Sequence, residues 1–198
     1  ARFSAHNLNN GTARMAFARV AELVDELDDG IHRGVKADGR LGRSNIVIDG
    51  QGYKWNGTIK IHNGSNYNTG TFTVKNVNFE TSDNKRNFIE ALENGSERYS
   101  TNLTVQNCTF TATGEAVNTA VGVQIKASKN AKVINCEATG LHSLVQANSC
   151  DETVEVKGCT VNDGKNGISF TQVKAITVEE TTINASEYGI RYDGRVEN

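Results

Sequence analysis

A short apolar pattern recurs along this chain, and in each copy its alternation changes phase at a central residue. Apolar residues stand mostly four and two positions before the centre, and one and three positions after it. Alternation with a period of two is typical of a strand that buries one face. A straight strand cannot bury all four positions, so the pattern predicts two short strands joined by a bend. The copies centre on Gly50, Asn76, Asn107, Asn135, Gly158 and Glu180.

A third strand is expected 9 to 16 residues after the centre of each copy. In the first copy, Tyr53 is expected to take the inward place that Phe79 takes in the second. With three short strands in each repeat of 22 to 34 residues, the sequence predicts an all-β parallel solenoid of about six turns. The inward pairs of the third strand are Ile59/Ile61, Ile89/Ala91, Val123/Ile125, Val145/Ala147, Ile168/Phe170 and Ile190/Tyr192.

The column of Asn76, Asn107 and Asn135 and the opening "NIVIDGQGY" (45–53) resemble the pectin lyase-like superfamily of right-handed parallel β-helices. The resemblance covers about residues 45 to 194. It implies a right-handed coil in which stacked asparagine amides form a hydrogen-bonded ladder at a buried bend. It implies no single activity, because this superfold hosts lyases, hydrolases, esterases, adhesins and phage tailspikes.

The two ends of the chain differ from the repeats. Residues 11–27 place apolar side chains at helical spacing, which predicts an amphipathic α-helix that caps the first turn. A partner-binding helix is the alternative. The expected organisation is therefore a capping helix with a Gly-rich basic linker over 1–44 and a β-helix domain over 45–198. Because only four residues follow the last predicted strand, we expect this domain to be truncated, with further chain or a neighbouring subunit of a homo-oligomer covering its final turn.

Three cysteines, Cys108, Cys136 and Cys159, occupy one inward column of successive turns. Parallel side chains on turns stacked about 4.8 Å apart fit disulfide geometry poorly. A straight buried column also lacks the tetrahedral convergence that zinc requires. We therefore interpret these residues as small apolar filler, with a disulfide or a metal site as the alternatives. Cys150 falls in a turn, where we expect it to be accessible.

The candidate binding face is the outer surface of the third strand, where proteins of the resembled superfamily usually bind carbohydrate. Lys60, Glu90, Gln124, Gln146, Ser169 and Arg191 form one outward row there, and Lys126, Asn148, Thr171 and Asp193 form a second. Aromatic residues in or near the adjoining loops, Tyr67, Tyr99 and Trp55, are candidates for stacking on sugar rings. The candidate ligand-binding residues are Lys60, Glu90, Gln124, Lys126, Gln146, Asn148, Tyr67 and Tyr99.

Catalytic and other binding classes find less support in the sequence. Glycoside hydrolysis uses a pair of carboxylates, and no two carboxylates fall on neighbouring turns of the candidate face. Glu90 has Lys60 one turn away, and we interpret these two residues as an ion pair. No acidic cluster for a metal is found, and no cofactor is expected. A net charge of −2 and a pI near 6.1 argue against nucleic-acid binding, and no apolar run has the length of a membrane span.

These observations favour a non-catalytic, extracellular or virion-surface module that presents polar loops to a polysaccharide or surface glycan. One alternative is a polysaccharide lyase or hydrolase whose site is incomplete in this chain. The other is a structural spacer or assembly unit, such as a phage tail or capsid fibre component.

Overall fold

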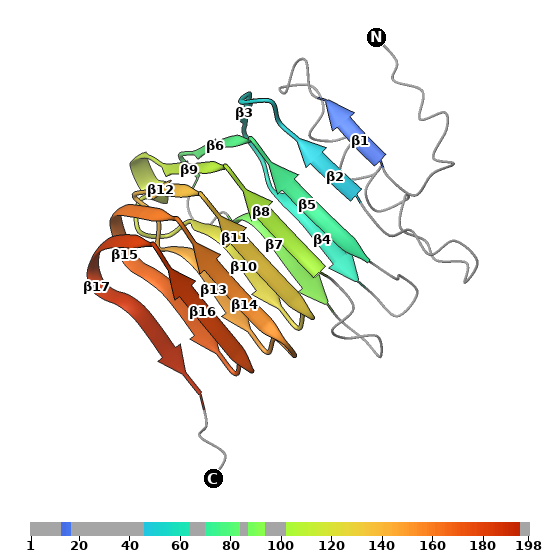
Figure 1. Ribbon diagram of the computed structural model, residues 1–198. Helices are drawn as coiled ribbons and strands as arrows, with labels where there is room; N and C mark the ends of the chain where they lie inside the picture. The colour runs from blue at the N-terminus through green and yellow to red at the C-terminus, as the bar shows by residue number, and fades with distance from the viewer. Residues whose placement is uncertain (1–12, 17–45, 64–69, 84–86, 94–101, 195–198) are drawn as a thin grey trace.

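The computed structural model describes residues 13–16, 46–63, 70–83, 87–93 and 102–194. All strand pairs in these ranges are parallel. The strands wind through two sheets, and successive coils lie side by side along one axis (Figure 1). The fold is therefore a parallel β-helix, as the repeat predicts.

The first sheet takes one strand from each repeat. Each strand pairs with its counterpart in the neighbouring repeats, so that Ile48 lies beside Val74 and Val74 beside Val105. From the first of these strands to the last, the chain makes about five turns. In stacking order the strands are β2 (Ile46–Asp49), β5 (Thr71–Lys75), β8 (Asn102–Gln106), β11 (Asn130–Ile134), β14 (Thr153–Lys157) and β16 (Ala175–Glu179).

The second sheet holds the other two strands of each repeat. In the later coils these two strands merge, and β15 (Thr160–Thr171) and β17 (Thr182–Asp193) run through both places. The strands after the bend are β3 (Lys54–Trp55), β6 (Asn78–Thr81), β9 (Thr109–Ala112) and β12 (Glu137–Thr139). The third strands are β4 (Ile59–Asn63), β7 (Asn87–Glu93), β10 (Val121–Lys126) and β13 (Ser143–Asn148), and a short 3₁₀ helix, Gly114–Ala116, precedes β10.

The bend between the first two strands is made by a residue in the left-handed conformation. Asn76, Asn107 and Asn135 have φ of 55°, 53° and 51°, and Gly158 and Glu180 take the same conformation. Asparagine and glycine tolerate this conformation better than other residues. The predicted bend is confirmed, and the asparagine column follows from backbone conformation.

One hydrogen bond of the expected asparagine ladder joins Asn107 Nδ2 to Asn76 Oδ1 at 3.5 Å. Asn76 Nδ2 in turn donates to Oδ1 of Asp49 at 2.9 Å. The expectation that the ladder lies at a buried bend is wrong, because Asn107 and Asn135 are exposed. Their amides face solvent, so they do not need one another to avoid a buried unsatisfied group.

The first bend is longer than the others. Both Gln51 and Gly52 have positive φ there, and the register then pairs Trp55 with Phe79. Trp55 is consequently buried, at 3% exposure, while Tyr53 is 46% exposed. The prediction that Tyr53 points inward is wrong, and burial also removes Trp55 from the residues that could stack on a sugar.

The core is the apolar column inside the coil. The predicted inward pairs of the third strand are buried from Ile59/Ile61 to Ile168/Phe170. Phe79 and Phe110 stack with ring centroids 5.1 Å apart and an interplanar angle of 4°, and Phe88 packs against both. Burial of each such side chain contributes about 1.5–3 kcal/mol.

All four cysteines carry thiols and are buried. Cys108, Cys136 and Cys159 lie in one column, and each Sγ donates to the carbonyl oxygen two residues earlier at 3.3–3.4 Å. The Cys108 thiol as hydrogen-bond partner, together with burial, raises the pKa of Cys136 to about 12. The interpretation as core filler is confirmed, whereas the expectation that Cys150 is accessible is wrong because it is 2% exposed.

The first described strand, β1 (Ala13–Ala16), pairs in parallel with β2. The helix predicted for residues 11–27 is therefore wrong at 13–16. Strand pairing satisfies the backbone groups at the edge of β2, which the helical spacing of the side chains does not reveal. Residues 17–27 and the linker lie outside the described residues.

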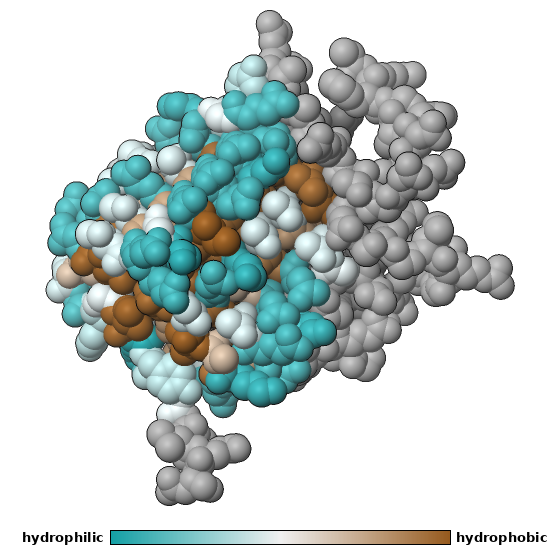
Figure 2. All heavy atoms as spheres, viewed as in Figure 1, coloured by the Kyte–Doolittle hydropathy of each residue, from teal (hydrophilic) through white to brown (hydrophobic). Residues whose placement is uncertain are grey.

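The last coil leaves its inward side chains uncovered. Ile190 and Tyr192, which continue the buried third-strand column, are 53% and 50% exposed. Apolar side chains show at the surface where β16 and β17 lie (Figure 2). Covering of this turn by further chain or by a subunit stays a prediction. Within the described ranges, no helix is long and apolar enough to cross a bilayer.

Candidate functional site

A groove with a volume of about 320 Å³ lies on the outer face of the third strands. It crosses β10, β13, β15 and β17, which are neighbours in the second sheet. Most of its lining residues carry amide, hydroxyl or charged side chains, alongside apolar surface. The lining residues are Gln124, Ile125, Lys126, His142, Gln146, Ala147, Asn148, Asn166, Ser169, Thr171, Arg191 and Asp193.

The parallel register aligns the polar side chains of the groove in two rows. Gln124 lies beside Gln146, Gln146 beside Ser169, and Ser169 beside Arg191. The second row is Lys126, Asn148, Thr171 and Asp193. The structure thus brings together Gln124, Lys126, Gln146 and Asn148 from the predicted binding residues.

Lys60 and Glu90 belong to the first row but are not among the residues that line the groove. Lys60 Nζ lies 3.9 Å from Glu90 Oε2, as the ion-pair interpretation expects. Asn87 Nδ2 donates to Glu90 Oε1 at 2.8 Å and to Gln124 Oε1 at 2.9 Å. Glu90 is thereby occupied by neighbouring side chains. Tyr67 and Tyr99 lie outside the described residues.

Two groove residues, His142 and Asn166, were not expected from the sequence. His142 Nδ1 lies 3.0 Å from Nε2 of Gln146 and 3.1 Å from Oγ of Ser143. The other ring nitrogen, Nε2, lies 3.4 Å from Nδ2 of Asn166, a residue that is 3% exposed. Each residue lies just before the inward pair of a third strand, at the corner where the alternation of that strand begins. A search of these corner positions for polar side chains could have predicted both residues.

His142 is a neutral side chain at neutral pH. Burial lowers the pKa of its imidazole below the ordinary value, and the positive charges of Lys165 and Arg191 lower it further. Glu187 acts in the opposite direction, but its carboxylate also pairs with Lys165 at 3.4 Å. An uncharged imidazole can both donate and accept a hydrogen bond, which suits contact with hydroxyl groups.

The charged groups of the groove are unequally paired. Arg191 Nε lies 2.8 Å from Asp193 Oδ2, and its guanidinium lies 5.6 Å from the centroid of the Tyr188 ring. Lys126 is exposed and, in the described part of the chain, makes no ion pair. Asp193 supplies the one carboxylate among the described lining residues, so the groove carries a modest positive excess.

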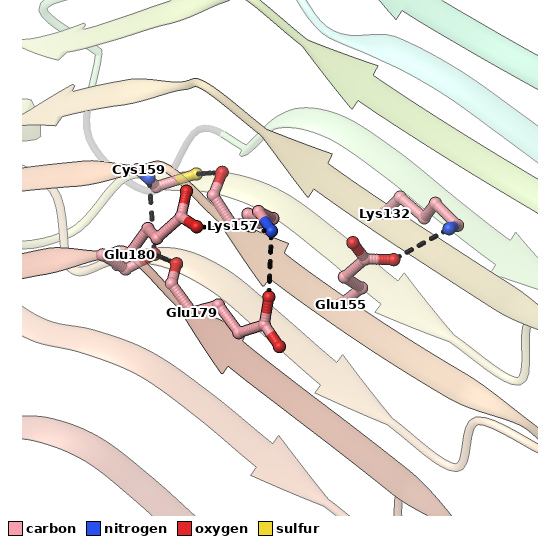
Figure 3. A network of polar contacts seen from close by, with 7 residues as sticks. Lys132, Glu155, Lys157, Cys159, Glu179 and Glu180 are labelled. Carbon is pink, nitrogen blue, oxygen red and sulfur yellow. Dashed lines mark hydrogen bonds and ion pairs between the residues drawn. The ribbon is translucent and has the colours of Figure 1, made fainter.

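The outer face of the first sheet is different, because its charges pair with one another along the stack. Lys132 pairs with Glu155 at 2.8 Å. Lys157 pairs with Glu179 at 3.0 Å and Glu180 at 3.5 Å, and these side chains lie over neighbouring strands (Figure 3). Exposed pairs of this kind contribute little to stability, and they leave few groups ready for a ligand.

The described residues contain no group of three or more His, Cys, Asp or Glu side chains arranged to hold a metal ion. No protein-family model, no curated protein and no solved structure matches this chain.

Proposed function

We propose that this chain is a non-catalytic glycan-binding module, with its ligand site in the groove over β10, β13, β15 and β17. The observation that carries the proposal is the alignment of two rows of amide, hydroxyl and charged side chains along a hollow of about 320 Å³. Sugar hydroxyls bind such groups directly and through water. An extracellular, cell-surface or virion-associated location follows from this proposal as part of it.

Tyr188 adds an apolar surface near the end of the groove. It is 51% exposed and lies beside Arg191. Tyrosine combines an apolar ring with a polar tip, which suits one face of a sugar ring. Tyr188 is thus proposed to stack on the ligand, in the role that the sequence assigned to Tyr67 and Tyr99.

A ligand with carboxylates fits the groove better than a neutral one. Lys126 is unpaired within the described residues, while the charge of Asp193 is already offset by Arg191. Glycoside hydrolysis uses two carboxylates, and the described lining offers one. Binding is therefore favoured over cleavage.

A second candidate function, as an assembly unit, is favoured by the exposed last coil. Ile190 and Tyr192 present inward-facing side chains to solvent, and β16 and β17 each have one neighbouring strand among the described elements. A parallel strand from a second copy would satisfy these backbone groups. Stable oligomers at micromolar concentration, measured by analytical ultracentrifugation, would support this candidate.

The test of the proposed function is gel filtration of the protein mixed with alginate, which carries carboxylates, or with neutral dextran, with and without calcium. Co-elution of protein with unshortened alginate supports glycan binding. Shortened polymer would show a lyase or hydrolase instead. Absence of co-elution with either polymer contradicts the proposal and leaves the assembly unit as the better account.

A further inference from the structure

The imidazole of His142 is held between two side-chain amides at the groove. Nδ1 faces the amide of Gln146 at 3.0 Å, and Nε2 faces the amide of Asn166 at 3.4 Å. A neutral imidazole has one N–H group and one acceptor nitrogen, so it cannot accept from two amide NH₂ groups. One of the two amides must therefore offer its oxygen to the ring.

Asn166 is the amide that offers oxygen. With its NH₂ facing His142, the buried Oδ1 has no hydrogen-bond partner, although the residue is only 3% exposed. The oxygen and nitrogen of an amide are nearly identical in shape. Turning the amide gives Oδ1 the N–H of His142 Nε2 as its hydrogen-bond partner and places Nδ2 where Oδ1 stood. His142 then carries its proton on Nε2, and Nδ1 is left as an acceptor beside Nε2 of Gln146 at 3.0 Å and Oγ of Ser143 at 3.1 Å.

This arrangement fixes what Gln146 presents to a ligand. Its NH₂ is used on His142, and within the described contacts no hydrogen bond reaches its Oε1. We propose that His142 is a positioning residue that decides whether Gln146 offers an acceptor or a donor to a saccharide in the groove, and that protonation of His142 exchanges the two. The inference rests on the proposed glycan-binding function for its ligand, but the hydrogen-bond relay itself rests on the contacts alone.

Protonated His142 donates from both nitrogens, so the NH₂ of Gln146 can no longer face Nδ1. The Gln146 amide then turns, offers Oε1 to the ring and directs NH₂ into the groove beside a new positive charge. Ligand acceptor groups such as sugar carboxylates then bind more tightly, because they accept from the Gln146 NH₂ and are attracted by the charge on His142. Neutral pH instead favours ligand hydroxyls, which donate to Oε1.

The charged groups around the ring set the pH of this exchange. Lys165 on β15 and Arg191 on β17 oppose protonation, and Glu187 on β17 favours it. In the same groove, β10 contributes Lys126 and β17 contributes Asp193, which pairs with Arg191. Because burial also opposes protonation, the exchange lies on the acid side of the ordinary histidine range.

Nuclear magnetic resonance of the full chain tests the relay without any ligand. The chain has four histidines, so the His142 signals are assigned by their loss in His142→Phe. At neutral pH we expect the Nε2–H tautomer, and we expect the side-chain NH₂ signals of Gln146 to shift with the His142 titration. An Nδ1–H tautomer, or Gln146 signals that do not follow the titration, would overturn the proposal.

Binding of alginate and dextran between pH 4.5 and 8 tests the consequence. Alginate affinity should rise about five- to tenfold as His142 becomes protonated. This rise should vanish in His142→Phe and shrink in Gln146→Met, which keeps the new positive charge but lacks the turning amide, while both variants keep the wild-type circular dichroism spectrum. A pH profile that persists in both variants would overturn the proposal. If the resonance data show the relay but neither polymer binds at any pH, the relay stands and the proposed glycan function fails.

Discussion

Asn107 donates a hydrogen bond from Nδ2 to Oδ1 of Asn76 at 3.5 Å, and both residues bend the chain in the left-handed conformation. Two turns beyond the last asparagine of this column, Glu180 occupies the same bend with φ of 50°. A residue with a long side chain pays about 1–2 kcal/mol for this conformation. The bend is thus a place where single substitutions report on backbone strain.

Replacement of Glu180 by asparagine is expected to raise the free energy of unfolding by about 0.5–1 kcal/mol. Asparagine relieves the strain, and the ion pair with Lys157 at 3.5 Å is exposed and contributes little. Urea unfolding measures the change. Glu179→Asn is the matched control, since Glu179 also pairs with Lys157 but lies in extended strand β16. A loss of stability in Glu180→Asn as large as in the control would count against strain at this bend.

Replacement of Gly122 by alanine is expected to destabilise the protein by about 1–3 kcal/mol. A Cβ at Gly122 would lie 2.6 Å from the carbonyl oxygen of Leu144 on the next coil, which is part of the backbone and cannot turn aside. Thermal unfolding followed by circular dichroism measures the loss.

Gly189→Ala is the control for Gly122→Ala. Gly189 occupies the equivalent position on the last coil, where an added Cβ would meet only Cγ2 of Ile183 at 4.0 Å. This variant should unfold within a few degrees of the wild type. Equal losses of thermal stability in both variants would contradict the idea that close contact with the next coil excludes a Cβ at Gly122.

The thiols should react with a disulfide reagent such as DTNB only after unfolding. All four cysteines are at most 2% exposed, and the pKa of Cys136 is raised to about 12. The raised pKa leaves Cys136 with little of the thiolate that attacks such a reagent at pH 8. Fast reaction of one or more thiols in the native protein at pH 8 would contradict the burial.

Replacement of Lys126 by alanine is expected to weaken alginate binding about fivefold, equivalent to about 1 kcal/mol. The effect should shrink at high ionic strength, since salt screens an exposed charge. Lys132→Ala is the matched control, because Lys132 lies on the other sheet and pairs with Glu155. Affinity electrophoresis in gels that contain alginate measures both variants. Equal weakening by the two substitutions would point to net charge rather than to the groove.

The repeat could be predicted because strand period and phase reversal are local properties of the sequence. The bends at Asn76 and Asn107 and the burial of Ile89 and Val123 follow directly from that pattern. The first repeat could not be aligned correctly, because two residues of positive φ lengthen its bend and exchange the places of Tyr53 and Trp55. Nothing in the spacing of apolar residues marks that extra length.

The groove was predictable in part for a similar reason. Gln124, Gln146 and Ser169 alternate with buried residues, so their outward row follows from strand period. His142 and Asn166 stand at corners, where alternation begins, and they meet across 24 residues of sequence. Contacts between corners depend on how the coils stack. The strand at Ala13–Ala16 was missed because strand pairing at a sheet edge depends on the neighbouring strand.

The location of the ligand in the groove is tested most directly by filling it. Ser169 lies in the first row on β15 and is half-buried, and Ser169→Trp should block the groove. Thr104→Trp, at a half-buried outward position on β8 in the other sheet, is the matched control. In affinity electrophoresis with alginate, we predict that the wild type and Thr104→Trp are retarded equally and that Ser169→Trp migrates as if no polymer were present. Equal retardation of all three proteins, or of none, would contradict glycan binding in this groove.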